Sequence, residues 1–180
     1  MRELSLNILD VAQNSISAGA SLITIEVNES LTDHTLLIGI YDNGKGMSEE
    51  QVKSVVDPFF TTRTTRKVGM GIPLFKMAAE QTGGRLEIKS QVGVGTEVRA
   101  YFKTDSVDFT PLGDVAGTVQ MLITMNTDRD FLYKHSVDGK EFVADTREIK
   151  GILGDVPLNT YEVSQWLIEF IKENTEVLYK

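Results

Sequence analysis

The sequence predicts a two-layer α/β sandwich of the α+β class, in which helices lie on one face of a mixed sheet. Over residues 1–103, segments with helical spacing of apolar residues alternate with short apolar runs typical of strands. Their order is helix, two strands, helix, loop, helix and two strands. Ten of the fifteen glycines lie in this range and punctuate the segments. A smaller α+β segment of different composition follows.

The charge distribution divides the chain at the same place. Residues 1–103 carry 11 basic and 12 acidic side chains, a balance of −1, whereas residues 104–180 carry 7 and 14, a balance of −7. An acidic second half argues against nucleic-acid binding, because neutralising phosphates requires a basic face. Such a segment also fits a surface that faces a protein partner.

The composition excludes several kinds of site. The 180 residues include no cysteine, which rules out disulfides, thiolate metal sites and cysteine nucleophiles. The two histidines, His34 and His135, lie far apart in the sequence, which argues against a histidine-based zinc site. The acidic residues near the N-terminus argue against a secretory signal, and no apolar run approaches the roughly 20 residues needed to span a bilayer. We therefore expect a cytoplasmic protein without a membrane partner.

The first elements are a helix and two strands. Apolar residues recur at helical spacing through residues 3–18, and Gly19 follows where a C-cap glycine is expected. Residues 22–27 and 35–42 are apolar runs that predict strands joined by a polar connection. Asp42 ends the second run, and after Asn43 come Gly44 and Gly46, which are separated by one residue. This predicts a tight turn, or a backbone surface against which a ligand can lie.

A short helix and a loop come next. Ser48, with Gln51 three residues later, has the pattern of a capping box, and Asp57–Pro58 should end this helix. Residues 61–71 have no periodicity and are expected to form a mobile loop. Pro73 fits the first turn of a further helix that ends at two glycines. Two strands around the turn at residues 92–95 complete the first half.

The second half has its own predicted elements. Residues 104–116 are expected to be a linker, and residues 117–180 a small α+β domain or an extension of the first half. Residues 118–125 and 130–137 look like a pair of hairpin strands, and Asp138–Gly139 is a strong turn signal after them. The last helix has an apolar stripe that we expect to be core, consisting of Val163, Trp166, Leu167, Phe170 and Ile171.

Two patterns point to chemistry. Three G-x-G pairs occur at residues 44–46, 69–71 and 93–95, but none extends to a P-loop or to GxGxxG, so any one of them alone fits ordinary turns. Asp10 and Asn14 are four residues apart and share one face of the first helix. A carboxylate there can act as a general base, and an amide oxygen can join a Mg²⁺ ion. Taken alone, the same pair also fits two solvated side chains.

In combination, the segments DVAQNSISAGA, DNGKGM, DPFFTTR, RKVGMGIPLF and GVGTEVRAYF resemble the Bergerat-type, histidine kinase-like (GHKL) ATPase family. This family includes sensor histidine kinases, anti-sigma-factor serine kinases, DNA gyrase and mismatch-repair ATPases. The resemblance covers residues 2–103. The quoted segments include, in their usual order, the four sequence boxes that characterise the family. The resemblance implies a Bergerat-type sandwich that binds ATP and Mg²⁺, with residues 1–103 as the ATP-binding domain.

The resemblance also implies roles for single residues on the adenine side. Asp42 matches the aspartate that accepts the adenine amino group, and Gly44 and Gly46 match the glycines that let the base approach. Met47 matches the apolar residue that packs on the ring. Thr96 matches the threonine that shares a water molecule with the aspartate.

On the phosphate side, Asn14 matches the magnesium-binding asparagine. Gly69 and Gly71, with Met70 between them, match the lid glycines at a helix start that meets the phosphates. Lys67 precedes these glycines and is either a phosphate contact or a solvated lid residue.

The chain departs from the family pattern in two places. Asp10 stands where hydrolysing members and serine kinases usually carry glutamate, and many sensor kinases carry asparagine. Aspartate keeps the carboxylate but has a shorter reach, so slow turnover is expected. No phospho-accepting histidine domain precedes the first helix, so self-phosphorylation of the sensor-kinase kind is not expected.

Three functions remain open. The leading hypothesis is a stand-alone Mg-ATP-dependent kinase in signal transduction, in which Asp10 acts on the acceptor hydroxyl of a separate protein. The second is an ATP-gated binding module that hydrolyses ATP slowly or not at all. The third is a nucleotide-responsive regulatory subunit whose acidic second half docks a larger enzyme. The oligomeric state is open too, a homodimer included.

Overall fold

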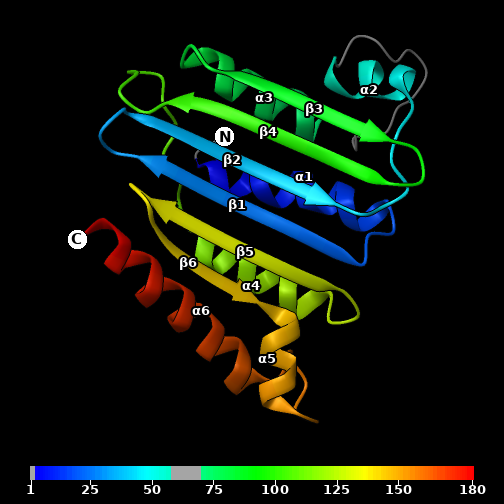
Figure 1. Cartoon of the computed structure of the whole chain (residues 1–180), viewed down its shortest axis with the longest axis vertical. Coiled ribbons are helices and arrows are strands. Elements are labelled where there is room, and N and C mark those ends of the chain that lie inside the picture. The colour runs from blue at the N-terminus through cyan, green and yellow to red at the C-terminus, as the bar shows by residue number, and fades with distance from the viewer. Residues whose placement is uncertain (1–2, 58–69) are drawn as a thin grey trace.

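The computed structural model describes residues 3–57 and 70–180, which form one six-stranded mixed sheet of order β3-β4-β2-β1-β5-β6 (Figure 1). Helices α1, α3 and α4 lie side by side behind the sheet in this view, which confirms the predicted fold class. In chain order the elements are α1 (Leu4–Ser17), β1 (Leu22–Ser30), β2 (Thr35–Asp42), α2 (Glu49–Val56), α3 (Gly71–Gln81), β3 (Arg85–Gln91), β4 (Gly95–Lys103), α4 (Val115–Met125), β5 (Asp130–Val137), β6 (Lys140–Asp145), α5 (Thr146–Leu153), α6 (Tyr161–Glu176) and the 3-10 helix η1 (Val177–Tyr179).

Helix α1 is the central helix of the covering layer. Its apolar residues at helical spacing, among them Leu4, Ile8 and Ala12, are fully buried against the sheet. The helix ends as predicted, because Gly19 adopts a φ of +77° that favours glycine. The helix packs between α3 and α4, so both halves of the chain contact it.

The antiparallel strands β3, β4 and β1 alternate apolar and polar residues, whereas β2 is a nearly continuous apolar run. Ile23, Ile25 and Val27 of β1 face the helices and are fully buried or nearly so. The register pairs Asp42 of β2 with Thr96 of β4 and with Ile23 of β1. The predicted turn aspartate therefore lies at the end of β2, beside the starts of β1 and β4. The capping box is confirmed as well, since Ser48 caps α2 with Gln51 in the reciprocal position.

The second half of the chain extends the same sheet. Strand β5 pairs with β1 in parallel from Leu22–Asp130 to Glu29–Val137, and β6 pairs with β5 in antiparallel fashion. The Asp138–Gly139 turn between them is confirmed, with φ values of +47° and +88°. The prediction of a strand at residues 118–125 is wrong, because these residues belong to helix α4.

The physical reason for this error is that a short apolar run fits both structures. The run is rich in β-branched residues, which favour strands, but Val115, Val119 and Leu122 lie on one buried helical face. Asp114 also caps the helix by accepting a hydrogen bond from the backbone N–H of Gly117, at 3.0 Å. Packing against α1 and α6 therefore outweighs the strand propensity of the sequence.

Helix α6 confirms most of the predicted apolar stripe. Val163, Leu167 and Ile171 are buried, and Phe170 is half-buried. The prediction is wrong for Trp166, which is 43% exposed and stacks on Phe170 with 4.7 Å between ring centroids. Among the described residues, no helix is long and apolar enough to cross a membrane.

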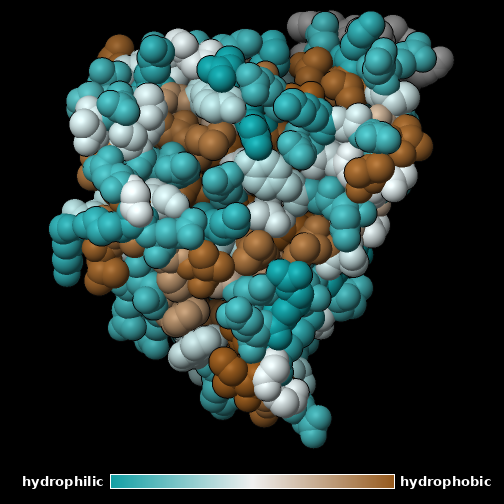
Figure 2. Space-filling model, in the orientation of Figure 1, coloured by the Kyte–Doolittle hydropathy of each residue, from teal (hydrophilic) through white to brown (hydrophobic). Residues whose placement is uncertain are grey.

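The sheet face opposite the helices carries charged and aromatic side chains. The guanidinium of Arg85 lies 3.9 Å from the ring centroid of Tyr101, and that of Arg99 lies 5.5 Å from the ring centroid of Tyr41. Tyr41 also donates a hydrogen bond to Glu26. Figure 2 shows this face, with hydrophilic side chains spread between smaller hydrophobic groups. Many of its charged groups are thus paired within the face itself.

A buried hydrogen-bond chain anchors the C-terminus to the sheet. His135 of β5 is 3% exposed; its Nδ1 lies 2.8 Å from the Tyr133 hydroxyl and its Nε2 lies 3.0 Å from the Tyr179 hydroxyl. Tyr179 donates its single proton to Glu29 of β1, at 2.8 Å. Nε2–H of His135 must therefore donate to Tyr179, while Nδ1 accepts from Tyr133. This neutral tautomer connects η1 to two strands.

Protonation of this histidine should make the fold sensitive to acid. Burial lowers the pKa of His135 from 6.5 to about 4. Below pH 6.5 the unfolded histidine binds a proton that the folded one does not, so stability falls as the pH falls toward 4. Between pH 7 and 5, we expect the wild type to lose about 2 kcal/mol more unfolding free energy than His135→Gln. Urea unfolding at both pH values tests this, and parallel losses in the two proteins would contradict it.

Candidate functional site

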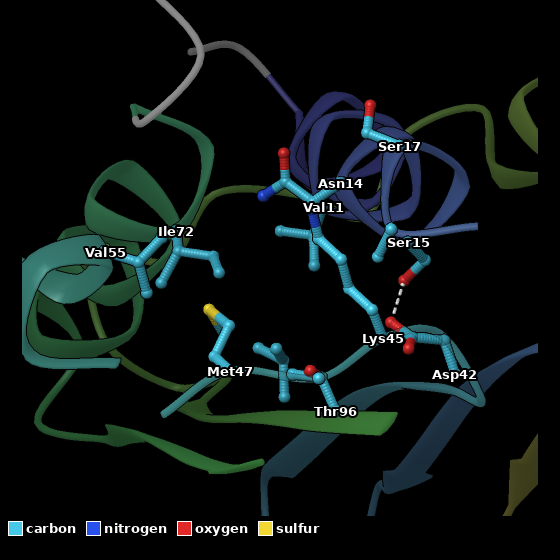
Figure 3. A pocket seen from close by; sticks show the side chains of 13 residues that line it. Val11, Asn14, Ser15, Ser17, Asp42, Lys45, Met47, Val55, Ile72 and Thr96 are labelled. Carbon is cyan, nitrogen blue, oxygen red and sulfur yellow. Dashed lines mark hydrogen bonds between the residues drawn. The ribbon is translucent and has the colours of Figure 1, made fainter. Parts of the chain in front are cut away.

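A cavity of about 330 Å³ opens between helix α1 and the ends of the central strands (Figure 3). Its walls come from α1, from the turn after β2, from α2, from the start of α3 and from β4. Six of the lining residues have apolar side chains and six have polar or charged ones, although most of the exposed lining surface is apolar. The lining residues are Val11, Asn14, Ser15, Ser17, Ala18, Asp42, Lys45, Gly46, Met47, Val55, Ile72, Thr96 and Val98.

The carboxylate of Asp42 is held in a fixed orientation at one wall of this cavity. Its Oδ2 accepts a hydrogen bond from the Ser15 hydroxyl at 2.5 Å (Figure 3). Its Oδ1 accepts a hydrogen bond from the backbone N–H of Gly44 at 2.9 Å. Ser15 is 3% exposed, so this contact is shielded from solvent. Each carboxylate oxygen keeps a free acceptor position. Asp42 can therefore accept a hydrogen bond from a donor group in the cavity.

The glycines after Asp42 are required by contacts within the protein. A Cβ atom on Gly44 would lie 2.8 Å from the Cβ and the carbonyl oxygen of Ala18. Gly46 has a φ of +73°, and a Cβ atom there would collide with the carbonyl oxygen of Gln91. These glycines let the turn lie close to α1 on one side and to the β3–β4 turn on the other.

A second hydrogen-bond network fixes the opposite side of the turn. The hydroxyl of Ser90 accepts a hydrogen bond from the backbone N–H of Met47 at 2.8 Å, and it lies 2.8 Å from the Thr96 hydroxyl. Ser90 also donates to the carbonyl of Gly95, at 3.1 Å. Thr96 and Met47 are therefore held at the cavity by one shared side chain.

Asn14 and Asp10 lie on α1 as their spacing predicts, but only Asn14 lines the cavity. The Asn14 side chain projects from α1 at the cavity (Figure 3), and it makes no hydrogen bond to another described side chain. Asp10 is exposed beside α3, where a Cβ atom on Gly71 would lie 3.2 Å from its own Cβ. Partial desolvation raises the pKa of Asp10 above its ordinary value.

The start of α3 closes one end of the cavity through Ile72. Its N-cap residue, Met70, gives no side-chain hydrogen bond to the helix, so backbone N–H groups of the first turn lack a side-chain cap. Gly71 is the first residue of the helix. The predicted lid residues Lys67 and Gly69 lie outside the described residues.

Several cavity residues were not among the predicted site residues. Ser15 and Ser17 follow Asn14 on α1, and Lys45 lies between Gly44 and Gly46. The sequence marks Ser17 only as a position that is often acidic in hydrolysing members of the family, with no role assigned to it. Helical spacing alone could have indicated Ser17, which follows Asn14 by three residues. The contact of Ser15 with Asp42 has no local signal, because the two residues are 27 positions apart. Among the described residues, no group of three or more His, Cys, Asp or Glu side chains could hold a metal ion.

The family of the chain follows from comparison with known sequences. The family model described as histidine kinase-, DNA gyrase B-, and HSP90-like ATPase matches residues 1–106. Because this match covers more than half of the 180 residues, the chain belongs to this ATPase family.

Individual relatives agree with this assignment. A putative sensor protein of Shewanella frigidimarina is 28% identical over 103 residues, covering 57% of this chain and 15% of the relative. Sensor histidine kinase ZraS of Salmonella typhi is 37% identical over 73 residues, covering 41% of this chain and 15% of the relative. The chain thus spans only about 15% of the length of these curated relatives.

A solved structure extends the likeness beyond the matched residues. The MutL ATPase domain of Aquifex aeolicus, complexed with ADP, superposes with a TM-score of 0.51 at 16% identity. The superposition covers 85% of this chain and 69% of the other. At this identity the likeness shows the fold alone. It therefore agrees with the six-stranded sheet but does not assign a function to the cavity.

The β3–β4 turn offers a test of how strongly backbone contacts shape the site. Gly95 has a φ of +146°, and a Cβ atom there would collide with the carbonyl oxygen of Asp42. We expect Gly95→Ala to lower the unfolding free energy by about 2–4 kcal/mol. Gly93, with a φ of +82° and open space around it, is the matched control, and Gly93→Ala should cost about 1–2 kcal/mol. Urea unfolding measures both variants. If Gly95→Ala and Gly93→Ala lost the same unfolding free energy, the collision at Gly95 would be contradicted.

Proposed function

We propose that this protein binds Mg-ATP in the cavity beside α1 and transfers the γ-phosphoryl group to a side chain of a separate protein. One observation carries the proposal: Ser15 and Gly44 hold the carboxylate of Asp42 at the wall of a largely apolar cavity. A fixed acceptor beside an apolar slot suits the amino group and the flat ring of adenine. Membership of an ATPase family supports the same nucleotide.

The adenine would lie between the turn and the apolar wall. Asp42 would accept a hydrogen bond from the exocyclic amino group, with the Thr96 hydroxyl nearby through a shared water molecule. Met47 and Val98 would pack on the ring, since both line the cavity. Gly46 would leave the backbone of the turn open to the edge of the base.

The phosphates would lie toward α3. Asn14 lines the cavity and has no side-chain partner among the described residues, so its amide oxygen is free to join a Mg²⁺ ion that the nucleotide brings with it. Such an ion neutralises phosphate charge during transfer. The uncapped N-terminus of α3, with Met70 and Gly71, would bind a phosphate group through backbone N–H groups. Lys67 and Gly69 are proposed to contribute to the same contact.

In the transfer step, a hydroxyl oxygen of the partner protein attacks the γ-phosphorus. A new O–P bond forms, the bond from the γ-phosphorus to the bridging oxygen breaks, and ADP leaves with its electron pair. The hydroxyl proton goes to the carboxylate of Asp10. Partial desolvation, which raises the pKa of Asp10, makes this carboxylate a better proton acceptor.

A second candidate function is an ATP-gated binding module without phosphotransfer. The position of Asp10 favours it, because this carboxylate is exposed and does not line the cavity. In this case nucleotide binding would change a surface recognised by a partner, and hydrolysis would be slow or absent. The two functions use the same adenine site. They differ in the role of Asp10, which accepts a proton only in the phosphotransferase.

Substitution of Asp42 tests the nucleotide site itself. Asp42→Asn replaces one acceptor oxygen by a donor group of nearly the same size, so it should weaken ATP binding by about ten- to a hundredfold. Asp33→Asn, an exposed substitution in the β1–β2 connection, is the matched control and should leave the affinity unchanged. Isothermal titration calorimetry with ATP measures both, and an unchanged Kd for Asp42→Asn would remove the adenine assignment.

Substitution of Asp10 separates the two candidate functions. The purified protein is incubated with γ-labelled Mg-ATP and an extract of its host, beside Asp10→Asn. For a phosphotransferase, label should appear on a protein with the wild type and fall by about a hundredfold or more with the variant, while ATP affinity stays within about twofold. Bound, unconsumed ATP with both proteins would instead identify a binding module. Equal labelling by both proteins would exclude Asp10 as the base.

A further inference from the structure

A column of aromatic rings reaches the surface at the edge of the sheet farthest from β3. It begins at buried Tyr133 of β5 and continues through Phe142 of β6, with 6.4 Å between ring centroids. Phe170 of α6 lies 5.3 Å from Phe142, and Trp166 lies 4.7 Å from Phe170. The outermost ring, Trp166, is 43% exposed. In Figure 1, α6 runs along β6 on the side of the molecule away from α2 and α3.

Acidic side chains border one side of the exposed end of this column. Glu162, Glu169 and Glu173 are all exposed and lie within about 60° of Trp166 around the helix axis, at 3.6 residues per turn. None of the three makes an ion pair or a side-chain hydrogen bond with a described residue. The one basic residue of α6, Lys172, is about 120° away from Trp166 around the same axis. The outer face of α6 thus combines an aromatic stack with three unpaired carboxylates.

We propose that this face of α6 binds a basic amphipathic helix of a partner protein. Exposed tryptophan, stacked on a second ring, is the residue type that most often dominates protein interfaces. The carboxylates that flank it complement lysine or arginine side chains placed beside an apolar anchor, and an arginine can also stack on the indole ring. The partner therefore presents leucine-like side chains on one face, bordered by basic residues.

The charge of this face selects against other occupants. Nucleic acid and anionic lipid surfaces carry negative charge and would be repelled by the three glutamates. A second copy of the chain would bring the same carboxylates together, which opposes self-association through this face. The surface lies across β1 and β5 from the nucleotide cavity, so it can be tested without nucleotide.

Trp166 is the only tryptophan of the chain, so its fluorescence reports directly on this surface. The probe is a synthetic 14-residue helical peptide of leucine and lysine without aromatic residues, and the control peptide has glutamate in place of lysine. Titration with the lysine peptide should shift the Trp166 emission to shorter wavelength in a saturable manner, and binding should weaken as salt is raised from 50 to 300 mM. The glutamate peptide should cause no shift.

Two triple variants with the same change in net charge separate this surface from general charge attraction. Glu162→Gln, Glu169→Gln and Glu173→Gln together should weaken peptide binding at least tenfold. Asp33→Asn, Asp105→Asn and Asp108→Asn together, at exposed positions away from α6, should leave it within twofold. All substitutions are on the surface, so circular dichroism should show both variants folded as the wild type.

Three outcomes would overturn the proposal. The first is no emission shift up to millimolar peptide, and the second is equal weakening in the two triple variants. The third is a dimer in sedimentation experiments whose dissociation on dilution exposes Trp166, which would assign this face to a second copy of the chain.

Discussion

The cavity depends on one close approach, between the C-terminal end of α1 and the turn that follows β2. The backbone N–H of Lys45 donates to the carbonyl of Ala18 at 2.9 Å, and no side chain at Gly44 would fit between the two segments. Asn43 accepts hydrogen bonds from the backbone N–H groups of Ser21 and Leu22, at 2.9 and 3.1 Å. These contacts hold the helix above the strand ends, and the space left between them is the cavity.

The same helix connects the cavity to the second half of the chain. Backbone N–H groups at the start of α1 donate to the carbonyls of Pro111 and Leu112, and the Glu3 side chain accepts from the N–H of Asp114. Farther along, α1 packs against both α3 and α4, while β5 extends the sheet beside β1. A shift of α1 on ligand binding would therefore alter contacts with both halves. One packed helix thus borders both the cavity and the second half of the chain.

Local signals in the sequence sufficed for most elements of the fold. The Ser48 capping box, the Gly19 helix end and the Asp138–Gly139 turn depend on a few neighbouring residues, and all three are confirmed. Helix α4 was missed because its apolar run fits a strand as well, and only its packing on α1 and α6 decides between the two. The parallel pairing of β5 with β1 joins residues more than a hundred positions apart. For the same reason the contact between Ser15 and Asp42 could not be predicted, although both residues lie in segments singled out from the sequence.

The fold requires the glycines of these motifs whether or not a ligand binds. Gly44, Gly46 and Gly95 are each required by a contact with another backbone segment, so the fold alone would retain them even in a member of the family without catalysis. Asp42 differs from them, because it keeps acceptor positions that the protein does not fill. The glycine motifs thus follow from backbone packing and are expected equally in the proposed kinase and in the proposed binding module. That distinction rests on Asp10, whose carboxylate lies beside the start of α3 rather than in the cavity wall. A phosphate bound at α3 would come close to this carboxylate, and a partner hydroxyl would have to enter from the exposed side of Asp10.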